Sequence, residues 1–154
     1  GVAGFFSEPL NLTTNIFFIA AALVAIYLII RLPPEPTRKR IDLFLLAGAL
    51  LAIGIGSGLW HLNPNGTTLL LDVIPITLFI HIYLVSAMRR ILQLSWLKTG
   101  IWWAAYVALT IAAQISLPPD LWNGTIMYIP TYAALIVLSI AVGTRSQRLR
   151  RNSK

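Results

Sequence analysis

Three ionisable residues lie inside the apolar segments of this 154-residue sequence: His61, Asp72 and His81. Ionisable side chains within a membrane span are costly and indicate a functional site. Ser57 lies four residues before His61, which places both side chains on one face of a helix. A histidine, a carboxylate and a hydroxyl are the groups that transfer protons and donate hydrogen bonds in enzymes, and histidine also binds metal ions.

Five apolar segments contain or flank these residues, and each is close to the ~20 residues needed to cross a ~30 Å hydrocarbon core. Backbone groups inside lipid must be satisfied within their own segment, so the segments are predicted to be helices. Only 11% of the residues are charged, whereas a soluble domain has about 25%. We therefore predict an all-α integral membrane protein, a single domain over residues 1–154 with spans at about 12–30, 43–62, 69–88, 99–117 and 125–142.

All twelve Lys and Arg residues fall on one side of this predicted five-helix bundle. They occupy the first connection, the third connection and the C-terminal tail, whereas Glu8 precedes the first span without any basic neighbour. The positive-inside rule then places the N-terminus outside and the C-terminus in the cytoplasm. This bias suits a multi-pass protein of the bacterial inner membrane, which we expect, or of an endoplasmic reticulum. The basic residues are expected to attract anionic lipid headgroups rather than nucleic acid.

A short turn at residues 63–68 makes the second and third spans antiparallel neighbours. From the helical rise, His61 lies ~1.5 Å, Asp72 ~5 Å and Ser57 ~7 Å below the outer helix ends, so the three share one layer. We interpret this layer as part of a site. His81 lies ~18 Å down. It cannot share a metal ion with His61, because ligand bonds are ~2 Å long, and an interhelical hydrogen bond is expected for it.

Each member of the layer also has a purely structural interpretation. His61 could be an interfacial histidine, Asp72 could favour the positive end of its helix dipole, and Ser57 could be a small packing residue. Gly54 and Gly58 form a small-xxx-small pair beside them, which would let a neighbouring helix come close.

Two motifs in this sequence are similar to those of a known family. The run Gly54-Ile55-Gly56-Ser57-Gly58-Leu59-Trp60-His61, followed by Asp72-Val73-Ile74-Pro75, resembles the bacterial branch of the alkaline ceramidase family. That family belongs to a superfamily of membrane hydrolases that includes the adiponectin and progestin receptors. The segment 8–15 resembles the family signature E-x-x-N-x-x-S/T-N, and the likeness extends over essentially the whole chain.

The resemblance implies a seven-span, zinc-dependent hydrolase that cleaves the amide bond of ceramide or a related long-chain N-acyl lipid. It implies that His61 is one of three zinc ligands, that Ser57 positions or polarises the substrate carbonyl, and that Asp72 orients the zinc-bound water or moves its proton. Glu8 matches a family position associated with a calcium site. Zinc lowers the pKa of bound water to about 7, a carboxylate can relay the proton, and a hydroxyl can stabilise the oxyanion.

The sequence departs from the family at its ends. The family carries two further zinc histidines in an H-x-x-x-H pair on its last helix and an acidic stretch before its first helix, and neither occurs here. We therefore expect a chain truncated at both ends relative to the family. The alternative is a membrane protein that binds lipid or a partner without catalysis. A transporter is a third possibility, against which the absence of internal repeats argues.

Overall fold

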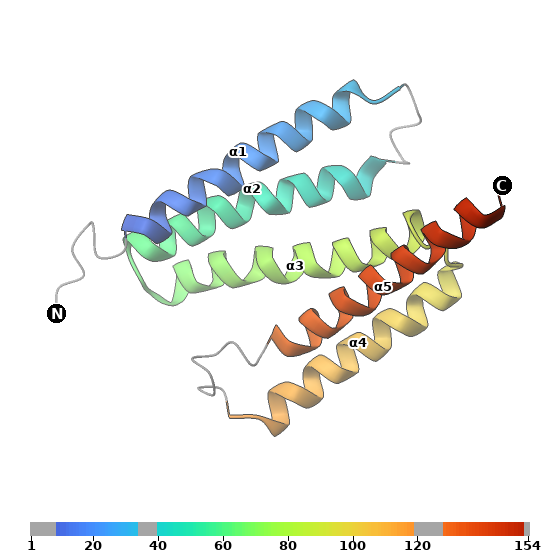
Figure 1. Cartoon of the computed structure of the whole chain (residues 1–154). Helices are drawn as coiled ribbons and strands as arrows, with labels where there is room; N and C mark the ends of the chain where they lie inside the picture. Colours follow the sequence, from blue (N-terminus) through green and yellow to red (C-terminus); the bar gives the residue numbers. More distant parts are fainter. Residues whose placement is uncertain (1–8, 34–39, 119–127, 153–154) are drawn as a thin grey trace. The chain divides into compact units, whose positions relative to one another are not determined.

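The computed structural model describes residues 9–33, 40–118 and 128–152. Within these ranges the chain forms five α-helices and no strand, which confirms the all-α prediction. The helices are α1 (Pro9–Arg31), α2 (Ile41–Leu62), α3 (Gly66–Arg90), α4 (Trp96–Ser116) and α5 (Ile129–Asn152) (Figure 1). The chain forms two compact units, residues 1–83 and 84–154, so α3 contributes to both.

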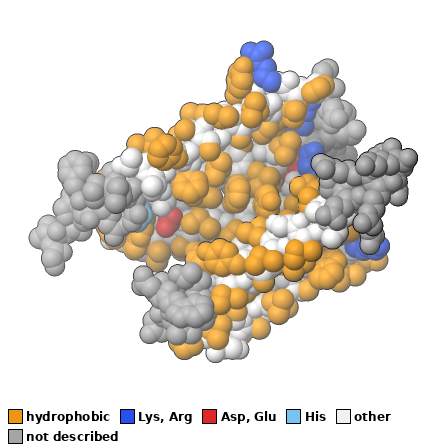
Figure 2. All heavy atoms as spheres, viewed as in Figure 1, with side chains coloured by type: hydrophobic (Ala, Val, Ile, Leu, Met, Phe, Trp, Pro, Cys, Tyr) orange, Lys and Arg blue, Asp and Glu red, His pale blue; other side chains and the backbone are white. Residues whose placement is uncertain are grey.

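Three of the described helices are long and apolar enough to cross a membrane, namely α1 from Thr13 onward, α2 and α3. Many of their large apolar side chains point outward, as the hydrophobic surface in Figure 2 illustrates. Phe17 is 70% exposed and Ile30 is 66% exposed. Soluble monomers rarely expose continuous apolar surface on this scale. The exposed apolar surface is therefore compatible with lipid as the solvent of these helices.

The other two helices are not among these three. α4 has the length of a span and contains the polar residues Lys98 and Gln114. The apolar part of α5 covers Ile129–Arg145 and is shorter than the others. α5 continues to Asn152, well beyond the predicted end at residue 142. The additional residues form an arginine-rich segment. Cationic side chains in this position favour a helix C-terminus.

The third helix begins three residues earlier than predicted. The side-chain Oδ1 of Asn65 accepts hydrogen bonds from the backbone N–H groups of Thr67 and Thr68, at 3.0 and 3.1 Å. The Thr68 hydroxyl oxygen in turn accepts from the backbone N–H of Asn65 at 3.0 Å. This reciprocal arrangement is a variant of the capping box, in which two side chains satisfy free N–H groups at a helix start. The α2–α3 connection is therefore only residues 63–65.

In the first unit, α1 runs antiparallel along α2 (Figure 1). Gly54 and Gly58 of α2 are both buried. A Cβ atom on Gly54 would lie 3.0 Å from the backbone oxygen of Asn15 and 3.1 Å from the backbone nitrogen of Ile19. The two backbones thus approach closely at this glycine, which confirms the predicted close neighbour at Gly54 and identifies it as α1.

In the second unit, polar contacts connect the ends of α3, α4 and α5. The hydroxyls of Tyr106 in α4 and Thr131 in α5 are hydrogen-bonded at 2.9 Å. The Arg89 guanidinium lies 4.3 Å from the centre of the Trp96 ring, a cation–π contact that closes the α3–α4 turn. Gln93, in this turn, has a left-handed backbone with φ of 53°, and its side-chain oxygen accepts a hydrogen bond from Arg145 of α5.

Candidate functional site

The candidate site lies where α3 meets α2, at Gly56. A Cβ atom on Gly56 would collide with the backbone carbonyl of Leu71 and would lie 3.2 Å from the backbone nitrogen of Asp72. Since these neighbours are backbone atoms of a helix, they cannot move aside as a flexible side chain could. Gly56 therefore permits a backbone-to-backbone contact between the two helices, and it places Ser57, the next residue of α2, at the level of Asp72.

The backbone of α3 is unusual at this contact. Pro75 lies inside α3 and has no N–H group to donate to the carbonyl of Leu71, four residues earlier. In a lipid environment such a freed carbonyl must find another favourable neighbour. Gly56 packs against that same carbonyl, in the manner of the Cα–H···O contacts found between closely packed helices. The interruption of the α3 hydrogen-bond ladder thus coincides with the α2–α3 contact.

Asp72 carries the least satisfied polar group of this contact. Its side chain is half-buried, and its Oδ1 atom is buried without a hydrogen-bond partner among the described residues. Leaving such an oxygen unpaired costs about 1–3 kcal/mol, and more when the group is charged. Native structures keep few such groups, and a group of this kind is a candidate for a catalytic or ligand-binding role.

The structure places the predicted layer at a revised depth. Asp72 is the seventh residue of α3, not the fourth, because the helix begins at Gly66. It therefore lies ~9 Å from the helix start, close to the ~7.5 Å that separates Ser57 from the end of α2. His61 remains next to the last residue of α2 and is half-buried, as Ser57 is. Ser57 and Asp72 thus share a level, and His61 lies one helical turn nearer the α2–α3 turn.

The remaining predicted residues do not join this layer. His81 lies nine residues after Asp72 on α3, ~13 Å further along the helix. Glu8, the predicted calcium position, lies outside the described residues. Among the residues that the structure describes, no group of three or more His, Cys, Asp or Glu side chains could hold a metal ion. A catalytic zinc ion usually takes three protein ligands, so the described residues alone do not fit a complete zinc site.

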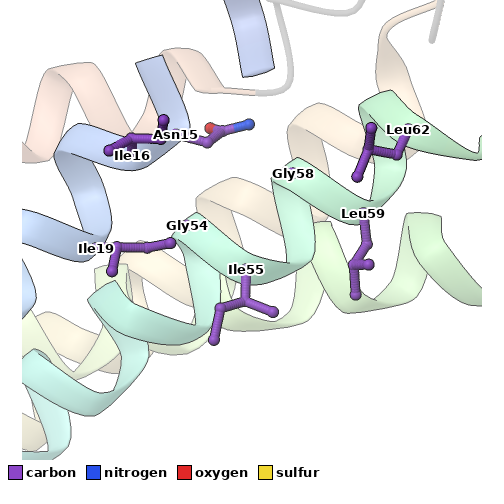
Figure 3. A pocket seen from close by; sticks show the side chains of 8 residues that line it. All are labelled: Asn15, Ile16, Ile19, Gly54, Ile55, Gly58, Leu59 and Leu62. Atoms are coloured by element: carbon purple, nitrogen blue, oxygen red, sulfur yellow. The ribbon is translucent and has the colours of Figure 1, made fainter. Parts of the chain in front are cut away.

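A groove lies between α1 and α2 and follows α2 from Gly54 to Leu62 (Figure 3). Its volume is about 260 Å³. Apart from Asn15, the lining residues are apolar or glycine: Ile16, Ile19, Gly54, Ile55, Gly58, Leu59 and Leu62. Asn15 is only 6% exposed, and its Nδ2 atom has no hydrogen-bond partner among the described residues. Asn15 belongs to the first sequence motif but was not predicted as a site residue, although a lone amide within an apolar span is a detectable signal.

Comparison with known protein families, curated proteins and solved structures finds no match to this chain. The resemblance to ceramidases therefore rests on the two sequence motifs alone.

Proposed function

We propose that this chain is part of a multi-pass membrane hydrolase that cleaves the amide bond of ceramide or a related N-acyl lipid. The observation that carries the proposal is the buried Oδ1 of Asp72, which has no hydrogen-bond partner in the part of the chain that the structure describes. It lies at the point where Gly56 brings α2 against α3. The ceramidase-like motif supplies residues to both sides of this contact. A carboxylate oxygen that no described residue engages is suited to exchange a proton with a substrate.

Each residue of the layer has a defined part in this proposal. Asp72 accepts a proton from the attacking water and returns it to the leaving amine. The Ser57 hydroxyl donates a hydrogen bond to the carbonyl oxygen as negative charge develops on it. His61 is the zinc ligand that the family resemblance implies, and the other ligands must come from outside the described residues.

The proposal includes five spans, with the layer near the outer face and the basic connections in the cytoplasm. The sequence contains no cysteine, so single cysteines can report this topology. In intact cells, a membrane-impermeant maleimide is expected to label Asn63→Cys, in the α2–α3 connection. It is expected to label Lys98→Cys only after the membrane is permeabilised. Both positions are exposed, so labelling of Lys98→Cys alone in intact cells would reverse the proposed orientation.

Metal analysis tests the hydrolase proposal at His61. The purified gene product that contains this chain is expected to hold one zinc ion per molecule. The His61→Ala variant should lose the ion, whereas His81→Ala, at the other histidine of the chain, should keep it. These 154 residues alone are expected to bind zinc weakly, because they supply one of the three usual ligands. Full zinc occupancy in the His61→Ala gene product would contradict the assignment.

The second candidate function is lipid or partner binding without catalysis. Two observations favour it: the described residues contain no three-ligand metal group, and an apolar groove lies between α1 and α2. Under this alternative, His61→Ala and Asp72→Asn leave the behaviour of the protein unchanged. Loss of lipid hydrolysis in either variant would exclude it.

A further inference from the structure

The α1–α2 groove contains one polar side chain among apolar ones. Asn15 lies opposite Gly54, because a Cβ atom on Gly54 would be 3.0 Å from the Asn15 carbonyl oxygen, whereas Leu62 lies nearer the α2–α3 turn (Figure 3). From Gly54 to Leu62 the groove follows α2 for ~12 Å. Apart from the amide of Asn15, no lining side chain is polar. The groove thus presents one hydrogen-bonding group within an otherwise apolar path along the helices.

This arrangement matches the chemistry of an acyl chain and its carbonyl. Nδ2 of Asn15 is a hydrogen-bond donor that is buried and has no partner among the described residues. It can therefore donate a hydrogen bond to an acceptor oxygen of a ligand. None of the described lining residues is charged, which suits a neutral part of a ligand. The volume of about 260 Å³ is below the ~300 Å³ at which small-molecule pockets begin, which suits a single chain lying along the groove.

We infer that this groove binds the acyl chain of the N-acyl lipid, and that Asn15 Nδ2 donates a hydrogen bond to the acyl carbonyl oxygen. The inference rests on the proposed function and adds a binding residue and a chain site to it. Gly58 of the groove follows Ser57 directly in α2, so the groove reaches the level of the proposed reacting layer along this helix.

A photoreactive lipid tests the groove. The probe is a long-chain N-acyl amine with a diazirine in its acyl chain, and it is cross-linked to the purified gene product in detergent. Labels are expected on Ile16, Ile55 and Leu59. Leu59→Trp should fill the groove and lower this labelling about tenfold, which corresponds to a loss of ~1.4 kcal/mol in binding free energy. Leu45→Trp, at another exposed leucine of α2, should leave it unchanged.

A second pair of measurements tests Asn15. The Asn15→Leu variant should bind the N-acyl probe about fivefold more weakly, because it loses one hydrogen bond. Its affinity for an alkyl diazirine of equal length without a carbonyl should be unchanged. Equal affinity of variant and unaltered protein for the N-acyl probe would overturn the inference. If Asn15→Leu does not fold, as judged by its helical content, the inference is tested by comparing the probe labelling of Leu59→Trp with that of Leu45→Trp.

The outcomes separate this inference from the proposed function, since labelling requires no hydrolysis. A labelled groove in a protein that cleaves no N-acyl lipid would support the binding site and contradict the hydrolase. Cleavage of the N-acyl lipid without labelling of the groove would support the hydrolase and contradict the binding site. A groove covered by another helix or by a second copy of the chain would exclude the probe, and the absence of labels would overturn the inference.

Discussion

The Asp72→Asn variant of the gene product that contains this chain is expected to hydrolyse N-acyl lipid about 10²–10⁴-fold more slowly, the usual contribution of a general acid–base group. The amide has nearly the shape of the carboxylate but cannot accept and return the proton. Because Asp72 does not line the acyl groove, lipid binding should change little. The measurement is the initial rate of fatty acid release at saturating substrate, together with the affinity for the N-acyl probe.

A polar residue of the same helix provides the control for this variant. Thr77 is exposed, and its hydroxyl donates to the backbone carbonyl of Val73 at 2.9 Å. Thr77→Val removes that local hydrogen bond without touching the α2–α3 contact, so its rate should stay near that of the unaltered protein. An Asp72→Asn rate that matches the Thr77→Val rate would show that the carboxylate takes no part in proton transfer.

The Gly56→Ala variant is expected to be destabilised by about 1–3 kcal/mol, the usual cost of overpacking a close contact. Its added methyl group would meet the carbonyl of Leu71, so α2 and α3 must separate. The separation also increases the distance between α2, which carries Ser57, and α3, which carries Asp72. We therefore expect this variant to lose hydrolysis as well as stability. Thermal unfolding in detergent, followed by circular dichroism, measures the first effect.

The matched control is Gly48→Ala, in the same helix. A Cβ atom on Gly48 would have no heavy atom within 4 Å, so alanine fits there without strain. Alanine is the better helix former by roughly 0.5–1 kcal/mol, and this variant should be equal to the unaltered protein or more stable. If Gly56→Ala proved as stable as Gly48→Ala, the backbone contact between α2 and α3 would be contradicted.

The positions of the helices could be predicted from the sequence because long apolar segments alternate with charged or turn-forming ones. The ends were less accurate where local hydrogen bonds decide them. Asn65 and Thr68 start α3 three residues early, and this shift alone moved Asp72 from the fourth to the seventh residue of its helix. Their spacing is a capping pattern that the sequence does contain.

The partners of each helix face could not be predicted in the same way. In a soluble helix, polarity indicates which face is buried, but α1, α2 and α3 are apolar on most sides. Small residues were therefore the best guide, and Gly54 did indicate a close neighbour. The burial of Asn15 and the contact of Gly56 with Leu71 depend on the rotation of each helix about its axis, which side-chain packing determines and composition does not.

The site was predictable only as a set of residues at one depth. The short α2–α3 connection placed Ser57 and Asp72 at a common level, and the structure agrees with that placement. The catalytic roles remain predictions that the resemblance supplies. The completeness of the zinc site depends on residues beyond His61, and the local sequence around α2 and α3 carries no information about them.

Product analysis tests the proposed hydrolase activity most directly. The gene product that contains this chain is purified in detergent with zinc and incubated with a ceramide, and both products are quantified by mass spectrometry. We predict release of free fatty acid and long-chain amine in equal amounts, with both lost in Asp72→Asn. A folded, zinc-loaded protein that leaves ceramide and related N-acyl lipids intact would contradict the hydrolase and favour the non-catalytic lipid-binding function.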